Sequence, residues 1–266
     1  MNLCRTWING TLCLALLGTF GRPIPAAGEE APAPKRSAEV EKPVDAKLGD
    51  PLAIGSVRCS RILYLGNSIT LHGPAPQIGW TGNWGMAATA EANDYVHLLT
   101  QRIATAAKGE PAIRVRNIAD FERNYDRYDV AAELKSELAF QPELVIVAIG
   151  ENVAALRDAA ARDRFRTAVE GLLKTLDGNG HPTIVVRSGF WADPAKDEAL
   201  EEAARVVGGT FVDIRTLGAD PTMAARSERK IEHDGVAGHP GDKGMKAIAD
   251  ALWKGLEKRA AEKPKK

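Results

Sequence analysis

Residues 61–70 read Arg-Ile-Leu-Tyr-Leu-Gly-Asn-Ser-Ile-Thr, and expectations for the rest of the chain follow from this stretch. Its apolar run has the length and composition of a buried strand, and it ends at a glycine followed by small polar residues. Ser68 therefore follows the end of a strand. Ligands of open α/β sheets bind at the carboxyl ends of the strands, so Ser68 is a candidate for chemistry. The alternative is that Asn67 and Ser68 only cap the next helix.

Strand and helix signals alternate along the remaining sequence. Short apolar segments predict further strands at 113–115, 144–149, 183–186 and 210–212. Apolar residues at helical spacing predict helices around 94–108, 131–138, 165–176, 200–207 and 245–256. This alternation predicts one α/β domain over residues 56–262, with a five-stranded parallel sheet covered by helices on both faces.

Two segments precede this domain. Arg5 is followed by an apolar run at 11–20, which is too short to span a bilayer but suits a signal peptide ending near Ala26 and Ala27. We therefore expect residues 1–27 to be a signal peptide and the protein to be exported to the periplasm or the extracellular space; a retained N-terminal anchor is the alternative. Residues 28–55 are rich in Ala, Pro and charged residues and are predicted to be a linker.

Composition narrows the class of partner. With 35 basic and 35 acidic residues the net charge is zero, so no general attraction to nucleic acid or anionic membrane is expected. We predict a small-molecule or carbohydrate ester as substrate, and no membrane span after signal cleavage.

Cys59 is the one cysteine outside the predicted signal peptide, so no disulfide is expected within the mature monomer. The spacing of His233 and His239 matches no metal-binding pattern, and neither a metal nor a cofactor is predicted. The oligomeric state is left open.

Three polar segments stand where catalytic residues are expected. Gly66-Asn-Ser68 follows the first strand, Gly150-Glu-Asn152 follows the third, and Gly238-His-Pro240 precedes the last helix. A serine hydroxyl needs a base to take its proton, and His239 is the candidate. The carboxamide of Asn152 and the backbone N–H of Ser68 are candidate donors to an oxyanion.

These segments resemble the SGNH (GDSL-like) hydrolase superfamily, whose four blocks carry a Ser in G-D-S, a Gly, an Asn in G-x-N-D and a His in D-x-x-H-P. The resemblance extends over the whole predicted domain, in block order. It implies a flavodoxin-like three-layer α/β/α sandwich. By the same resemblance Ser68 is the nucleophile, Asn152 an oxyanion donor and His239 the base.

The sequence departs from this pattern at the first three blocks. Asn67 and Val153 each stand where the family has an aspartate. No glycine follows the second strand, where the family residue donates its backbone N–H. The backbone of Ala119 or Asp120, or a glycine of the long loop after Ser68 such as Gly85, is the expected substitute.

The fourth block departs at the acid that orients the histidine. Val236 stands three residues before His239, and the nearest upstream aspartate is Asp234, five residues before it. Either the intervening loop bulges so that Asp234 completes a triad, or a Ser–His dyad operates with a backbone carbonyl holding the ring.

The segment 71–86 is a long loop of glycine, proline and two tryptophans, which we expect to close the site. Tryptophan faces suit the apolar faces of sugars, although core packing is their commoner role. The candidate substrate-binding residues are Asn67, His72, Trp80, Trp84, Gly85 and Trp191.

The expected function is that of an exported serine esterase acting on O-acyl esters, with a short acyl group such as acetyl on a carbohydrate. One alternative is a lipase-like or thioesterase-like hydrolase of longer acyl chains. Another is a non-catalytic, carbohydrate-binding module on a degenerate SGNH fold.

Overall fold

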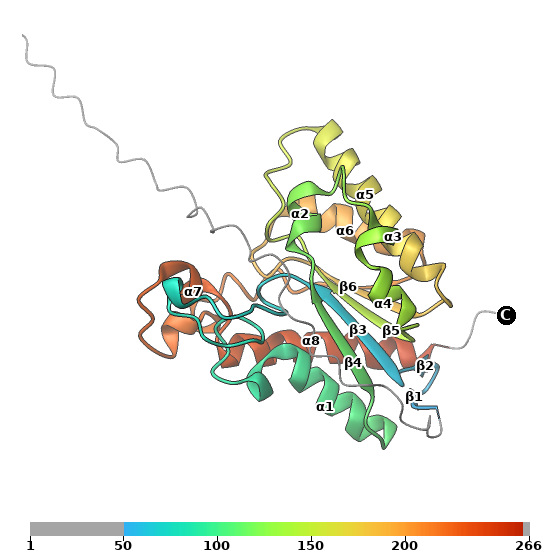
Figure 1. Cartoon of the computed structure of the whole chain (residues 1–266), viewed down its shortest axis with the longest axis horizontal. Helices are drawn as coiled ribbons and strands as arrows, with labels where there is room; N and C mark the ends of the chain where they lie inside the picture. The colour runs from blue at the N-terminus through green and yellow to red at the C-terminus, as the bar shows by residue number, and fades with distance from the viewer. Residues whose placement is uncertain (1–50, 263–266) are drawn as a thin grey trace, which may run out of the picture. The chain divides into compact units, whose positions relative to one another are not determined.

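The computed structural model describes residues 51–262 (Figure 1). These residues belong to the larger of two units into which the chain divides, Arg36–Lys266. The predicted signal peptide and nearly all of the predicted linker lie outside the described residues. Among the helices of residues 51–262, none has the length and apolar character needed to cross a membrane.

A five-stranded parallel sheet forms the centre of the domain, in the order β4-β3-β5-β6-β7. Its strands are β3 Arg61–Gly66, β4 Ala112–Asn117, β5 Leu144–Ala148, β6 Thr183–Arg187 and β7 Thr210–Val212. Numbered along the chain this is the order 2-1-3-4-5 of flavodoxin-like sheets. It confirms the predicted five-stranded α/β fold. Gly66 pairs with Asn117 on one side and Ala148 on the other, so the ends of β3, β4 and β5 meet at one edge.

Helices cover both faces of the sheet (Figure 1). α1 Tyr95–Ala107 and α8 Asp242–Ala261 pack on the face that includes Ile62 and Tyr64. The opposite face, with Leu63 and Leu65, is covered by α2 Ala119–Asn124, α3 Val130–Glu133, α4 Lys135–Ala139, α5 Ala159–Asp177 and α6 Pro194–Val206. Successive residues of a strand point to opposite faces, which is why one apolar run supplies both cores.

Two regions differ from the sequence-based expectation. The helix predicted around 131–138 is broken into α3 and α4, and α2 was not predicted at all. Helices of one or two turns are too short for their apolar period to be recognised. A hairpin of β1 Ala53–Ile54 and β2 Val57–Arg58 begins the described structure, so the last residues of the predicted linker pair with the domain.

The segment 71–86 is held by its own contacts. Isolated antiparallel bridges join His72 to Trp84 and Ala75 to Trp80, around the short 3-10 helix η1 Pro76–Ile78. Trp80 packs in a small core with Met86, Ala87, Ala225 and Val236. The segment therefore lies against the C-terminal region that carries η4 Ala225–Ser227 and α7 Asp234–Gly238 (Figure 1). The remaining 3-10 helices are η2 Glu91–Asn93 and η3 Pro221–Met223.

Candidate active site

A tight turn after β3 presents Ser68. The N–H groups of Thr70 and Leu71 both donate to the carbonyl of Asn67, at 2.9 Å each. A Cβ at position 66 would lie 1.9 Å from Thr70 Oγ1, so only glycine allows the chain to return this closely. The Gly-Asn-Ser sequence thus places Ser68, at 9% exposure, at the carboxyl edge of the sheet.

Ser68 and His239 form a hydrogen-bonded pair. Ser68 Oγ lies 2.8 Å from His239 Nε2, although 171 residues separate them. His239 Nδ1 lies 2.7 Å from the carbonyl oxygen of Gly235. A carbonyl only accepts, so Nδ1 carries the proton and Nε2 presents its lone pair to the serine hydroxyl. This neutral tautomer is the one that a general base requires.

The position of Asp234 favours a Ser–His dyad, in which a backbone carbonyl orients the histidine, over a triad completed by Asp234. Asp234 is exposed at the start of α7, and its backbone carbonyl accepts a bond from Arg226 Nη2 at 3.1 Å. Because α7 coils residues 234–238 into one helical turn, the carbonyl of Gly235 reaches the ring that follows the turn. A backbone carbonyl therefore occupies the position where the triad model expects a carboxylate.

His233 has a structural role at the start of the same turn. Its Nδ1 accepts a bond from the N–H of Val236 at 3.3 Å and so caps α7. Residues 51–262 contain no group of three or more His, Cys, Asp or Glu side chains that could hold a metal ion.

Asn152 is held by the buried carboxylate of Glu122, a residue that the sequence did not predict to be part of the site. Gly150 turns the chain after β5 with φ of +126°, a conformation that favours glycine. Glu122 on α2 then accepts bonds from the Gly150 N–H at 2.6 Å, from the Asn152 N–H at 3.2 Å and from Asn152 Nδ2 at 2.8 Å. Asn152 Oδ1 lies 3.5 Å from Arg123 Nη2. One hydrogen of the carboxamide Nδ2 is used by Glu122, and the other is available to an oxyanion.

A second buried carboxylate continues this network beneath Ser68. Asn67 Nδ2 donates to Glu122 at 3.1 Å and to Glu151 at 2.6 Å. Glu151 also accepts from Arg187 Nη1 at 2.7 Å and from the Phe190 N–H at 2.9 Å. Since all three charged groups and Asn67 are almost inaccessible, the network belongs to the floor of the site.

The two carboxyl groups have opposite pKa shifts. Burial raises the pKa of Glu122, and the neighbouring charge of Glu151 raises it further, against hydrogen bonds from Asn152 and Gly150 that lower it. Burial also opposes ionisation of Glu151, but the charge of Arg187 and the bonds it accepts hold its pKa below the usual value. Arg187 is therefore the counter-charge that keeps a carboxylate ionised under the site.

Backbone donors are the remaining part of an oxyanion hole. Two of the sequence-based candidates are already bonded: the Ala119 N–H donates to Asn117 Oδ1 at 2.9 Å, and the Gly85 N–H donates to Asp94 Oδ2 at 3.0 Å. Within residues 51–262 the backbone N–H groups of Ser68 and Asp120 have no hydrogen-bond acceptor. These two are the donors that the geometry leaves for substrate.

The three tryptophans proposed for substrate differ in exposure. Trp80 is 6% exposed and donates to the carbonyl of His72, and Trp84 donates to that of Ala88, both at 3.0 Å. These positions favour a packing role. Trp191 is 42% exposed, and its ring lies edge-on to the His239 ring with centroids 5.6 Å apart. Trp191 therefore offers an indole surface beside the base.

The other candidate substrate residues are less accessible. Asn67 is fully buried in the carboxylate network. His72 is half-buried, with Nδ1 2.6 Å from the carbonyl oxygen of Gly73. The buried Cys59 thiol has its pKa raised to about 11 by burial and by Glu143, which disfavours the reactive thiolate form.

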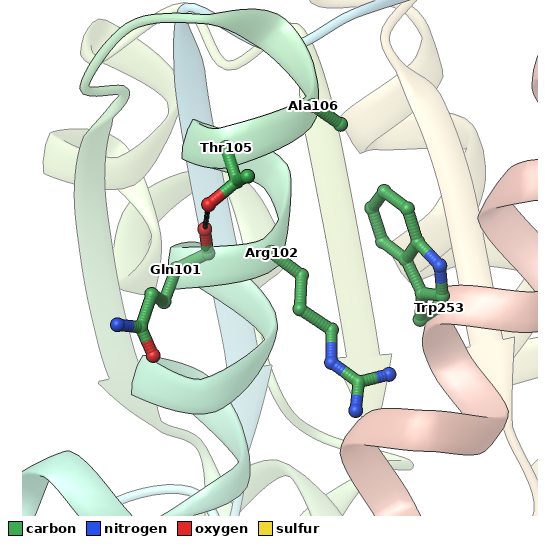
Figure 2. A pocket seen from close by; sticks show the side chains of 5 residues that line it. All are labelled: Gln101, Arg102, Thr105, Ala106 and Trp253. Carbon is green, nitrogen blue, oxygen red and sulfur yellow. Dashed lines mark hydrogen bonds between the residues drawn. The ribbon is translucent and has the colours of Figure 1, made fainter.

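A surface hollow of about 440 Å³ lies elsewhere, between α1 and α8 (Figure 2). Its lining residues are Gln101, Arg102, Thr105, Ala106 and Trp253. The guanidinium of Arg102 points toward α8, where it pairs with Asp250. None of the site residues lines this hollow, so it is separate from the Ser68 site.

No family model matches the chain, and no curated protein matches it in sequence. Among solved structures, a lipase/acylhydrolase from Enterococcus faecalis is 16% identical with a TM-score of 0.46, over 77% of this chain and 98% of that one. An acetyl xylan esterase from Butyrivibrio proteoclasticus is 14% identical with a TM-score of 0.47, over 79% and 66%. A family two carbohydrate esterase from Cellvibrio japonicus is 17% identical with a TM-score of 0.44, over 78% and 62%.

Identities this low say nothing about substrate, because one fold supports many functions. What this chain itself provides is a flavodoxin-like strand order and a hydrogen-bonded Ser68–His239 pair at the carboxyl edge of its sheet. Both are features that the sequence resemblance to the SGNH hydrolases predicts.

Proposed function

We propose that this protein is a serine ester hydrolase with Ser68 as its nucleophile and His239 as its base. The observation that carries the proposal is the 2.8 Å contact of Ser68 Oγ with His239 Nε2, on a ring whose other nitrogen is held by the carbonyl of Gly235. A serine hydroxyl and an imidazole oriented to take its proton are the two groups that nucleophilic acyl transfer needs.

In the proposed reaction, Ser68 Oγ attacks the ester carbonyl carbon while His239 Nε2 takes the hydroxyl proton. The carbonyl oxygen becomes an oxyanion, which the Asn152 carboxamide and the Ser68 N–H stabilise by hydrogen bonds. The tetrahedral intermediate expels the alcohol, which receives its proton from His239, and leaves an acyl group on Ser68. Water, deprotonated by His239, then attacks the acyl-enzyme; the bond from the acyl carbon to Ser68 Oγ breaks, His239 returns the proton to Ser68 Oγ, and the acid is released.

We propose a short acyl group on a carbohydrate as the substrate. The exposed indole of Trp191 beside His239 suits the apolar face of a sugar carrying the ester. The segment 71–86 supplies glycine, proline and packed tryptophans, and no row of exposed aliphatic side chains for a long acyl chain. Export through the N-terminal segment, as the sequence predicts, would bring the protein to such material.

A panel of p-nitrophenyl esters of increasing chain length, run beside acetylated oligosaccharides, tests this proposal. We expect turnover of acetyl esters that falls as the chain lengthens, and loss of turnover in Ser68→Ala. Ser227→Ala changes an exposed serine whose hydroxyl bonds only to nearby backbone, and serves as the matched control. A rate that rises with chain length would favour a lipase-like enzyme. Sugar binding without any turnover would favour a binding module.

A further inference from the structure

Glu122 takes no part in the reaction as proposed, yet its carboxylate is hydrogen-bonded both to Asn152 and to Asn67, the residue before the nucleophile. It is fully buried, and its carboxylate accepts bonds from four N–H groups. Three belong to the turn after β5, and the fourth is the side chain of Asn67, the residue before the nucleophile. All four partners are donors, as an ionised carboxylate requires.

We propose that Glu122 is a positioning residue that sets the orientation of the Asn152 carboxamide for oxyanion binding. A carboxamide can present either its oxygen or its nitrogen, and packing alone hardly distinguishes the two. Here Nδ2 lies 2.8 Å from the Glu122 carboxylate, while Oδ1 faces the guanidinium of Arg123 at 3.5 Å. Both contacts favour the same orientation, in which nitrogen and not oxygen remains for the substrate.

The same carboxylate accounts for the asparagine at position 67. Asn67 Nδ2 lies between the Glu122 and Glu151 carboxylates, at 3.1 and 2.6 Å. An aspartate would place a third carboxylate oxygen at these distances, with Arg187 as the positive charge bonded to Glu151. Like charges so close in a buried site are strongly unfavourable. The departure from the G-D-S pattern at Asn67 thus follows from the presence of Glu122.

This inference rests on the proposed esterase function, and it is tested with Glu122→Gln. A glutamine keeps the size but places an NH₂ group against N–H donors of Gly150 or Asn152. The Asn152 carboxamide can relieve this conflict by turning over, which removes its donor from the oxyanion. We expect kcat to fall about 100-fold with KM within about twofold, the pattern of a lost transition-state contact.

Glu143→Gln is the matched control, because Glu143 is also buried and accepts a backbone bond, from the Ser60 N–H at 2.7 Å. It precedes β5, at the opposite end of the strand from the site. We expect its kcat to stay within about twofold of wild type. An equal loss of kcat in both variants would assign the effect to general destabilisation and overturn the inference.

A double-mutant cycle with Asn152→Ala gives the decisive result, because coupled residues show non-additive effects. If Glu122 acts through Asn152, adding Glu122→Gln to Asn152→Ala changes kcat by less than about threefold. A further 100-fold loss, or near-normal kcat in Glu122→Gln alone, would refute it. If circular dichroism shows that Glu122→Gln does not fold, Glu122→Asp takes its place in the cycle with the same criteria. Failure of the esterase function itself would appear separately, as wild-type protein without Ser68-dependent turnover.

Discussion

Replacing Asp234 by asparagine is expected to leave catalysis almost unchanged. The carbonyl of Gly235, 2.7 Å from His239 Nδ1, orients the ring and fixes its tautomer, whereas Asp234 is exposed at the start of α7. The substitution leaves the hydrogen bond between His239 Nδ1 and the Gly235 carbonyl in place. A triad aspartate replaced by asparagine typically costs about 10⁴-fold in kcat, which is about 5.5 kcal/mol at 1.36 kcal/mol per tenfold. For Asp234→Asn we expect a loss below about fivefold, or about 1 kcal/mol.

Steady-state kcat and kcat/KM on p-nitrophenyl acetate separate these two magnitudes easily. Asp126→Asn is a suitable control, because Asp126 is an exposed aspartate whose carboxylate lies 3.8 Å from the side chain of its neighbour Arg127. His239→Ala should lose at least about 10³-fold, since it removes the base itself. A loss of 10³-fold or more in Asp234→Asn, with the melting temperature unchanged, would contradict the dyad and restore the triad.

Three further predictions follow from the site. Asn152→Ala should lower kcat about 100-fold with little change in melting temperature, as expected for an oxyanion donor; a lowered melting temperature with normal kcat would instead indicate that Asn152 only stabilises the turn after β5 through Glu122. Trp191→Ala should raise KM for acetylated oligosaccharides several-fold more than for p-nitrophenyl acetate, and an equal change for both would remove Trp191 from sugar recognition. Glu151→Gln should destabilise the fold by about 3–5 kcal/mol in urea unfolding, because it leaves the buried Arg187 without its counter-charge. The pKa of Glu151 is lower in the folded protein than in the unfolded chain, where it is about 4.3. Ionised Glu151 therefore stabilises the fold above that pH, and the stabilisation is lost as the pH falls below it. The free energy of unfolding of Glu151→Gln should accordingly fall less steeply with decreasing pH than that of the wild type.

Strands and helices that are long enough to show a regular hydrophobic pattern are predictable from the sequence. The five strands and the helices α1, α5, α6 and α8 appear where apolar spacing placed them. The pairing of Ser68 with His239 is predicted from the need of a serine for a base and from the resemblance of their segments to the SGNH pattern, and in the structure Ser68 Oγ lies 2.8 Å from His239 Nε2. Short elements were missed: α2 has no readable period, and it carries Glu122.

The buried charges could not be predicted for a related reason. A glutamate or arginine in sequence is normally a solvated residue, and only the packed structure shows that Glu122, Glu151 and Arg187 are enclosed together. The departure of Asn67 from the G-D-S pattern was the one available signal. Orientation of the histidine was likewise undetermined, because whether Asp234 or a backbone carbonyl reaches the ring depends on the helical turn of α7.

Covalent labelling of Ser68 tests the central claim most directly. A fluorophosphonate reacts with a serine hydroxyl that a base activates, and mass spectrometry of the digested protein identifies the modified residue. We expect one adduct on the peptide containing Ser68, complete loss of ester hydrolysis with its formation, and no adduct in Ser68→Ala or His239→Ala. An adduct on another serine, or labelling of Ser68 that is unchanged in His239→Ala, would contradict the proposed nucleophile and base.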